Sequence, residues 1–218
     1  MNMVHNLSSE ISILNQYVSE LRNVKVQNDR WRFRKNLERI GAVMAYEISK
    51  QLEYEVNNIE TPLGVAQCNQ LKSNVVVASI MRAGIPMHNG LLSVFDHAEN
   101  AFISAYRKHE KDGSFKIKLE YVSKPDLTDK ILILCDPMLA TGASMGLTYK
   151  ALIEEAKPKH THILSAIASS EGINYLERNF SKSAITIWSA AIDDELTAQS
   201  YIVPGLGDAG DLAFGKKL

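Results

Sequence analysis

One stretch of the chain combines an acidic side chain, hydroxyl groups and small residues in a pattern suited to a sugar phosphate. It directly follows the apolar run 131–135. Its members are Asp136, Pro137, Met138, Leu139, Ala140, Thr141, Gly142, Ala143 and Ser144. If a helix begins near Gly142, its unpaired N–H groups and its dipole would favour a phosphate dianion. Asp136 could then accept hydrogen bonds from the hydroxyls of the attached sugar.

The same 136–144 loop also fits an ordinary connection between a strand and a helix. In that interpretation Thr141 or Ser144 is the helix N-cap, and its hydroxyl accepts a hydrogen bond from a backbone N–H. Spacing alone does not decide between the two interpretations. Two other phosphate motifs are not supported. The sequence has no G-x-x-x-x-G-K-[ST] loop, and the G-x-G-x-x-G at 205–210 is followed by too few residues for a dinucleotide site.

Two arginines follow neighbouring candidate strands and could bind a diphosphate. Arg82 follows the apolar run 75–80 and stands near Gly84, which would let the backbone approach a ligand closely. Arg107 directly follows the run 101–106. Because a guanidinium can donate two parallel hydrogen bonds to a phosphate, two such side chains at strand ends indicate this ligand more strongly than one. A surface arginine beside a turn is the alternative for each.

The glycine-rich segment 201–211 is a candidate binding surface for a planar ligand. Its low helix propensity predicts an irregular backbone whose N–H and C=O groups could pair with the amide-like edges of a nucleobase. Asp208 and Asp211 could serve a cation, a water or a sugar. A disordered tail is the alternative. Several apolar residues in this part of the chain argue against complete disorder: Ile202, Val203, Leu206, Leu212 and Phe214.

These segments need a sheet that brings strand ends together. After residue 62, short β-branched runs alternate with helix-like segments, which predicts an α/β fold with a mainly parallel, twisted sheet flanked by helices. Strands are predicted at 75–80, 101–106, 131–135, 163–168 and 185–191. Helices or helix starts are predicted at 84–92, 142–156 and 171–179. Ligands bind at the carboxyl ends of strands in such sheets, so the candidate loops should converge there.

Two helices are predicted before the sheet. Ser8 or Ser9 could cap the first, and Asn28 or Asp29 marks the start of the second. Apolar residues recur at helical spacing in both: Ile11, Leu14, Val18 and Leu21, then Phe33, Leu37, Ile40, Met44, Ile48 and Leu52. We therefore expect one domain over 1–218, with N-terminal helices over 1–60 and an α/β core over 61–218. This core includes a lid at about 108–124 and a C-terminal binding segment over 193–218.

An antiparallel arm is also predicted within the core. Residues 115–122 alternate apolar with charged side chains, which is typical of a half-exposed strand. This strand is reached through the polar stretch 108–113, whose glycine and charges predict a loop. The segment 108–124 could close over a site at the strand ends and exclude water from it.

Charge and composition restrict the classes of protein to consider. The 218 residues carry 24 Lys+Arg and 25 Asp+Glu, so the net charge of −1 does not point to nucleic acid or anionic lipid. The two cysteines, Cys68 and Cys135, form no CxxC pair and have no nearby Cys/His spacing that suits zinc. Residues 1–9 lack the pattern of a signal peptide, and no apolar run could span a bilayer. We expect a cytoplasmic protein.

The candidate segments together resemble the uracil phosphoribosyltransferase family. The matching runs, in the family's order and spacing, are 82–87 with Gly90, 136–144, and 204–211 with 214–215. The last run is the most specific. The middle run differs from sister phosphoribosyltransferases, which usually carry two acidic residues where this chain has Asp136 and Pro137. The resemblance implies a type I phosphoribosyltransferase fold. It also implies transfer of the phosphoribosyl group from 5-phosphoribosyl 1-diphosphate (PRPP) to uracil, giving UMP and diphosphate with Mg²⁺.

The resemblance also implies a role for each matching residue. PRPP would be bound by the whole 136–144 loop together with Arg82, Arg107 and Asp208. Catalysis would depend on Asp136, Arg107 and Asp208. Uracil would meet main-chain groups of Ile202, Gly207, Asp208 and Ala209. No residue is assigned as a metal ligand, because Mg²⁺ would be held mainly through PRPP. A homodimer or larger homo-oligomer is implied, and GTP is a candidate effector.

Some positions depart from the family pattern and keep alternatives open. Ala143 stands where the family usually has glycine, and residues 108–124 and 215–218 differ from the usual lid and ending. An inactive homologue therefore stays an alternative. Transfer to a base other than uracil would show as donor consumption with that base. A uridylate-sensing RNA-binding regulator would retain RNA in a salt-dependent way without forming UMP.

Overall fold

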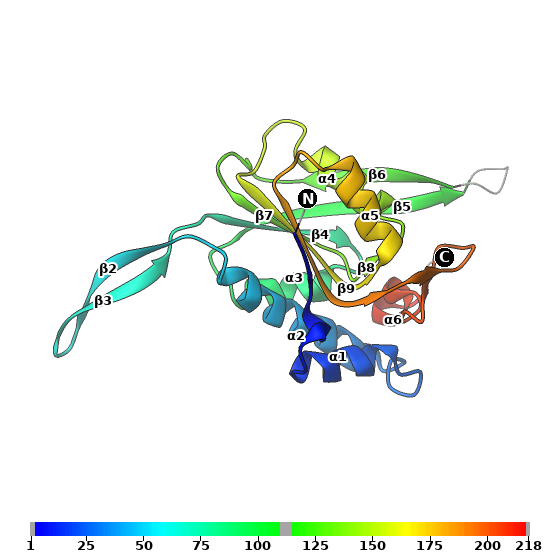
Figure 1. The fold of residues 1–218 in the computed structure, drawn as a ribbon, viewed down its shortest axis with the longest axis horizontal. Helices are drawn as coiled ribbons and strands as arrows, with labels where there is room; N and C mark the ends of the chain where they lie inside the picture. The colour runs from blue at the N-terminus through cyan, green and yellow to red at the C-terminus, as the bar shows by residue number, and fades with distance from the viewer. Residues whose placement is uncertain (1–2, 110–114, 217–218) are drawn as a thin grey trace.

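The central feature of the fold is an eight-stranded sheet. The computed structural model of the chain describes residues 3–109 and 115–216, with the backbone alone at 105–109 and 115–118 (Figure 1). The sheet has the order β1-β10-β9-β7-β4-β5-β6, and β8 pairs with β9. Its strands are β1 (Met3–Asn6), β4 (Val75–Met81), β5 (Glu99–His109), β6 (Phe115–Ser123), β7 (Ile131–Cys135), β8 (Met138–Leu139), β9 (His160–Ser169) and β10 (Ile185–Asp193).

All strand pairs of this sheet are parallel except β5 with β6, which is antiparallel. The five strands predicted from apolar runs are confirmed, and so is the antiparallel arm at 115–122. The mainly parallel α/β fold class is confirmed as well. Because β7 and β9 are buried almost throughout, they show the continuous apolar runs of a sheet covered on both faces.

Helices cover both faces of the sheet (Figure 1). They are α1 (Ile13–Arg22), α2 (Arg30–Ser49), α3 (Ile85–Leu92), α4 (Ala143–Leu152), α5 (Ser170–Asn179) and α6 (Ala209–Phe214). Alternate residues of β4 enter two separate cores, because successive side chains of a strand point to opposite faces. Val77 packs with α1, α2 and α3, whereas Ala78 packs with α4 and α5.

The predicted start of the first helix is wrong. The helix begins at Ile13, where the Ser12 hydroxyl accepts a hydrogen bond from Leu14 N at 3.3 Å. Ile11 lies outside the helix and is fully exposed. The reason is that Met3–Asn6 joins the sheet as the edge strand β1, followed by the 3₁₀ turn Leu7–Ser9. The second helix starts as predicted, with Asp29 as its N-cap.

A hairpin that the sequence did not predict crosses the boundary between the segment assigned to N-terminal helices and the predicted α/β core. β2 (Tyr54–Thr61) pairs antiparallel with β3 (Gly64–Leu71), and the pair projects from the body of the molecule (Figure 1). Since α2 ends at Ser49, Leu52 falls outside that helix. Most hairpin residues are exposed on both faces, so their sequence lacks the apolar alternation that marks a half-buried strand.

A buried histidine, His162, bonds to the tryptophan that stacks on the N-terminal strand. His162 on β9 is 2% exposed, and its Nδ1 accepts a hydrogen bond from Trp188 Nε1 at 3.0 Å. Trp188 on β10 stacks on His5 of β1, with 4.0 Å between ring centroids. Burial, followed by the charges of His160 and His5, lowers the pKa of His162 to about 3. The folded protein therefore keeps His162 neutral at physiological pH, where it can accept the indole hydrogen bond.

We predict that acid destabilises the fold through His162. The unfolded chain protonates this histidine below its ordinary pKa of 6.5, whereas the folded chain does so only near pH 3, so stability falls with pH across this window. At pH 5 the loss relative to pH 7 should be about 2 kcal/mol from this residue. Urea unfolding of His162→Asn, which keeps an acceptor near the Nδ1 position, should show a correspondingly smaller loss.

The exposed His97 provides the control, because its side chain is 99% accessible. His97→Asn should show the same pH dependence of unfolding free energy as the wild-type protein. Equal losses between pH 7 and pH 5 in the wild type and in His162→Asn would show that the acid sensitivity comes from elsewhere.

Candidate active site

The 136–144 loop leaves β7 and runs along β9 before a helix begins. Asp136 N donates to Leu164 O at 3.1 Å, and Ile167 N donates to Pro137 O at 3.0 Å. The short strand β8 continues this pairing with β9. The backbone of the loop is thus held by the sheet on one side, and Asp136 stands at the carboxyl end of β7 as the sequence predicts.

The helix that follows the loop starts without a side-chain cap. Gly142 is the N-cap residue of α4 with φ 78°, and among the described residues no side chain caps this helix. Thr141 Oγ1 accepts a hydrogen bond from Ala143 N at 3.4 Å instead. The alternative in which Thr141 or Ser144 is the N-cap is therefore wrong. An N-terminus of this kind has N–H groups to which a phosphate can bind.

Glycines let the loop pack against the first turn of α5. A Cβ atom on Gly172 would lie 2.3 Å from Ala140 O, and one on Gly142 would lie 2.9 Å from Gly172 O. Ser169 at the end of β9 joins the two segments, since its hydroxyl donates to Ala140 O at 2.5 Å and accepts from Gly172 N at 2.9 Å. Only residues without a side chain allow this approach, so α5 fixes the shape of the loop.

The loop after β4 lies next to the end of β7. A Cβ atom on Gly84 would lie 3.0 Å from Cys135 O, and Cys135 Sγ donates to Gly84 O at 3.8 Å. Arg82 in this loop is exposed, and the peptide bond that precedes it is cis. Its Nη2 donates to Gly215 O at 3.2 Å, and its guanidinium carbon lies 6.0 Å from the centroid of the Phe214 ring. Arg82 thus connects this loop with the C-terminal segment.

The C-terminal segment is ordered by a small sheet and a short helix. β11 (Glu195–Leu196) pairs antiparallel with β12 (Ile202–Val203), and the side chain of Ile202 is buried. Asp208 caps α6, because its Oδ1 accepts a hydrogen bond from Asp211 N at 2.9 Å. The disordered-tail alternative is therefore wrong. The prediction of an irregular backbone throughout 201–211 is also wrong in part, since α6 begins at Ala209 despite the glycines around it.

Three of the predicted segments converge at one edge of the sheet. Their apolar side chains pack around one core cluster: Ala83 from the loop after β4, Met138 and Ala140 from the 136–144 loop, and Ile202, Leu206, Ala209, Leu212 and Phe214 from the C-terminal segment. Gly207 and Asp208 are exposed beside this cluster. The backbone of Arg107 lies in β5 opposite Ile117, but its side chain is outside the described part. Residues 110–114 of the predicted lid also lie outside it.

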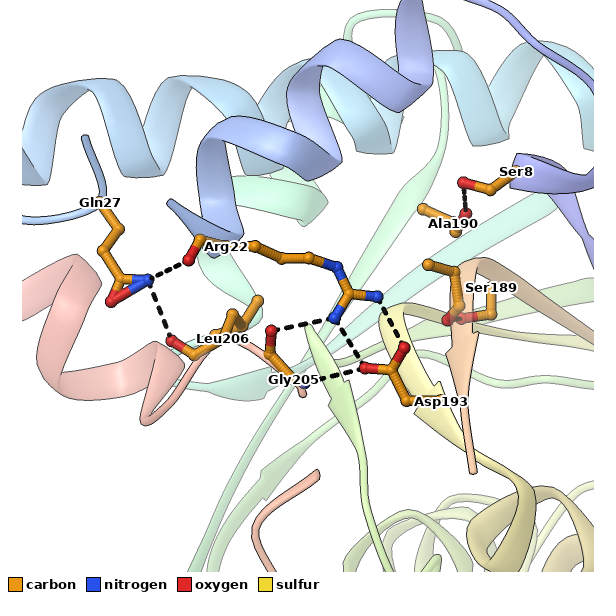
Figure 2. A network of polar contacts seen from close by, with 9 residues as sticks. Ser8, Arg22, Gln27, Ser189, Ala190, Asp193, Gly205 and Leu206 are labelled. Carbon is orange, nitrogen blue, oxygen red and sulfur yellow. Dashed lines mark hydrogen bonds and ion pairs between the residues drawn. The ribbon is translucent and has the colours of Figure 1, made fainter. Parts of the chain in front are cut away.

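Sequence reasoning missed the side chains that hold the C-terminal segment. Arg22 at the end of α1 forms two hydrogen bonds of 2.7 Å with the Asp193 carboxylate at the end of β10, and it donates to Gly205 O at 3.0 Å (Figure 2). Gly205 N donates to Asp193 Oδ2 at 2.9 Å. Gln27 Nε2 donates to Leu206 O at 3.3 Å. Because Arg22 and Asp193 are 171 positions apart, no local spacing could have revealed the pair.

The basic start of α2 contributes a second attachment. Arg34 Nη1 donates to Ala213 O at 2.7 Å, whereas Arg32 forms a bidentate ion pair with Glu20. The bond from Arg34 to Ala213 O thus holds the C-terminal segment at a second point. A pocket of about 290 Å³ lies beside it, lined by residues of α2 and α3 and by Phe214.

The protonation states of two buried side chains, Cys135 and Asp193, bear on the chemistry of the site. Burial, together with the charge of Asp136, raises the pKa of the Cys135 thiol, so this group stays protonated and is a poor nucleophile. Burial alone would raise the pKa of Asp193, but the hydrogen bonds from Arg22 and Gly205 and the charge of Arg22 outweigh it and lower that pKa. Asp193 is therefore an anion held in a fixed position.

The described residues contain neither a cluster of metal ligands nor a membrane-spanning helix. Among the described residues, no group of three or more His, Cys, Asp or Glu side chains is placed to hold a metal ion. No helix within the described part is long and apolar enough to cross a membrane.

Comparisons with known proteins show the family of the chain. The family model described as Uracil phosphoribosyltransferase matches residues 8–216. The chain is 55% identical over 218 residues to a Uracil phosphoribosyltransferase of Porphyromonas gingivalis, covering 100% of both chains. It is 39% identical over 206 residues to that of Methanococcus maripaludis, covering 93% of this chain and 86% of the relative.

Solved structures agree on the fold. The AQ2163 protein of Aquifex aeolicus has a TM-score of 0.87 at 28% identity, covering 98% of each chain. The orotate phosphoribosyltransferase of Mycobacterium tuberculosis in complex with PRPP has a TM-score of 0.51 at 10% identity over 86% of this chain and 93% of that one, and it supports the fold alone. From the family match and the full-length identity, the chain belongs to the uracil phosphoribosyltransferase family of enzymes.

Proposed function

We propose that this chain transfers the 5-phosphoribosyl group from PRPP to uracil, giving UMP and diphosphate, in pyrimidine salvage. The observation that carries the proposal is the uncapped start of α4 at Gly142, at the end of a loop whose Met138 and Ala140 share a core cluster with the C-terminal segment. A phosphate site and a carboxylate suited to a ribose then belong to one loop, and a backbone suited to a base belongs to the segment that packs in the same cluster as that loop. Relatives with this named activity match over the full length of the chain.

The donor is assigned to the loops after β7 and β4. The 136–144 loop holds the ribose 5-phosphate, with the N-terminus of α4 as its anion site and Asp136 accepting from the ribose hydroxyls. Arg82 and Arg107 contact the diphosphate. A guanidinium carries five N–H donors, of which Arg82 uses one in its hydrogen bond to Gly215 O. Asp208, in the C-terminal segment, also faces the donor. We assign Asp136, Arg107 and Asp208 as the catalytic residues.

Uracil is assigned to the main chain of the C-terminal segment. Ile202, Gly207, Asp208 and Ala209 offer backbone groups to the edges of the base. The bonds that anchor the segment to the rest of the protein involve residues on either side of Gly207, namely Gly205 and Leu206 before it and Ala213 after it. A base recognised by a fixed backbone is selected by the pattern of donors and acceptors on its edge.

The reaction needs positioning and charge stabilisation more than covalent chemistry. The bond from ribose C1 to the diphosphate loosens first and then breaks, so that diphosphate leaves. Uracil N1 attacks C1 from the opposite face and loses its proton to solvent. The protonated Cys135 offers no nucleophile, in agreement with this route. Asp136 orients the ribose and stabilises the positive charge that develops on it. The arm formed by β5 and β6 is assigned to closing the site against water.

Mg²⁺ is assigned to the donor and not to a protein cage. This ion favours one or two carboxylates plus substrate phosphates, and the exposed Asp208 beside the donor site fits that donor set. When bound, it neutralises charge on the leaving diphosphate. We also assign GTP as a candidate effector and a homodimer or larger homo-oligomer as the assembly. The proposed location is the cytoplasm, where the exposed thiol of Cys68 stays reduced.

The first prediction is that the protein forms UMP from uracil and PRPP in the presence of Mg²⁺. Each free base should be assayed separately for donor consumption, with and without GTP. Uracil should be consumed at a kcat/KM at least about 100-fold above cytosine, because a site built to bond base edges rejects a base that leaves those bonds unmade. Consumption of PRPP with another base only, or with none, would contradict the proposed function.

The second prediction concerns the carboxylate at the end of β7. Asp136→Asn should lower kcat by about 100-fold, because an amide cannot stabilise the positive charge that develops on the ribose. The control is Asp129→Asn before the other end of the same strand, where an exposed residue with φ 58° accommodates asparagine well. Asp129→Asn should keep wild-type turnover. If Asp136→Asn also kept it, the role given to Asp136 would be wrong.

The third prediction concerns the packing of the 136–144 loop. Gly172→Ala places a methyl group against Ala140 O, so the loop must shift and the KM for PRPP should rise about tenfold with a smaller change in the KM for uracil. Asn174→Ala on the exposed face of the same helix is the control and should change neither constant. A rise limited to the KM for uracil would place the phosphate elsewhere.

A further inference from the structure

We propose that Arg22, Gln27 and Asp193 are positioning residues that determine how the enzyme selects uracil. These three side chains, which we call the base-loop anchor, hold Gly205 and Leu206 and so fix the backbone of the residues that follow. The inference rests on the proposed function, because it gives a cause for the placement of the base-binding main chain. None of the three side chains is assigned a contact with uracil or PRPP.

The anchor holds both backbone groups of a single residue. Arg22 Nη1 donates to Gly205 O at 3.0 Å, and Gly205 N donates to Asp193 Oδ2 at 2.9 Å (Figure 2). The two side chains are themselves joined by two bonds of 2.7 Å, one to each carboxylate oxygen. An arginine and a carboxylate paired in this way have a fixed mutual orientation. Gly205 can therefore neither rotate nor shift without breaking bonds to the pair.

The conformation of Gly205 makes this hold necessary. Its φ is 53°, and a Cβ atom there would lie 2.1 Å from Ile202 O. The chain thus turns sharply between β12 and the residues that precede α6, in a conformation that glycine adopts at a cost in chain entropy. A free glycine turn would sample many conformations. The anchor selects one of them, and with it the direction in which the backbone of 207–209 points.

Burial separates the anchor from an ordinary surface ion pair. Asp193 is 7% exposed and Arg22 is 24% exposed, so water and salt screen their attraction less than they screen an exposed pair. A buried ion pair often adds little to stability compared with apolar residues of the same size. Its directional bonds can instead specify one conformation, and here those bonds end on the base-binding segment.

The position of the anchor relates the base site to the donor site. Asp193 is the last residue of β10, and Asp136 follows β7, with only β9 between these two parallel strands. Arg22 is the last residue of α1. Gln27, which also donates to Leu21 O and Arg22 O, adds the bond to Leu206 O. The anchor thus fixes the base-binding backbone to the same strand edge that carries the donor loop.

The test is steady-state kinetics of Arg22→Lys with uracil and with cytosine as acceptors. Lysine keeps the positive charge but cannot hold both oxygens of Asp193 and Gly205 O together. The KM for uracil should rise about tenfold, the KM for PRPP should stay within about twofold, and the preference for uracil over cytosine in kcat/KM should fall about tenfold. A change of base preference is not expected from a loss of stability alone.

The matched control is Arg32→Lys. Arg32 forms a bidentate pair with Glu20, with N–O distances of 2.8 Å, but this pair is exposed and does not contact the C-terminal segment. Arg32→Lys should leave both KM values and the base preference unchanged. An equal effect of the two substitutions would overturn the inference, because it would show a general response to the loss of an ion pair.

A third variant covers the case in which Arg22→Lys does not fold. Gln27→Leu removes the bond to Leu206 O without leaving a buried charge unpaired, and it should raise the KM for uracil about threefold with an unchanged KM for PRPP. An unchanged KM for uracil in a folded variant would overturn the inference. A wild-type protein that forms no UMP would instead refute the proposed function, whereas active variants with wild-type base preference would refute the anchor alone.

Discussion

Parallel pairing of the central strands is the constraint on which the rest of the structure depends. Because β4, β7, β9 and β10 run in the same direction, their carboxyl ends lie along one edge. Each end delivers one part of the site: the Arg82 loop, the 136–144 loop, the start of α5 and Asp193. No single helix or loop could hold these groups together. The parallel register of four buried strands does so.

Side-chain hydrogen bonds connect the loops that the sheet brings together. The hydroxyl of Ser169 joins the 136–144 loop to α5, and Arg82 joins the loop after β4 to the C-terminal segment. The glycines at 84, 142 and 172 serve the same end, because each allows a backbone approach that a Cβ atom would block. These contacts fix the mutual placement of the segments that are assigned to the phosphate and the base.

The features that could be predicted from the sequence are those that depend on burial or on residues close together in the chain. The central strands could be predicted because a sheet covered on both faces needs continuous apolar runs. The 136–144 loop could be recognised because its small residues and hydroxyl groups lie in one local stretch. β1 was missed because it is a short edge strand, and the hairpin of β2 and β3 because most of its residues are exposed on both faces. The base-loop anchor was missed because it depends on tertiary pairing alone, which no spacing within a segment records.

The distance in sequence between Arg22 and Asp193 has a consequence for biosynthesis. The chain emerges from the ribosome with α1 first, but Asp193 ends the last strand of the main sheet, and β1 finds its partner β10 equally late. Contacts of such long sequence separation form slowly and close the fold. A nascent chain can thus contain the loop that we assign to the donor well before it contains Asp193. The segment that we assign to uracil is therefore synthesised after the donor loop, and its contact with α1 must wait for that synthesis.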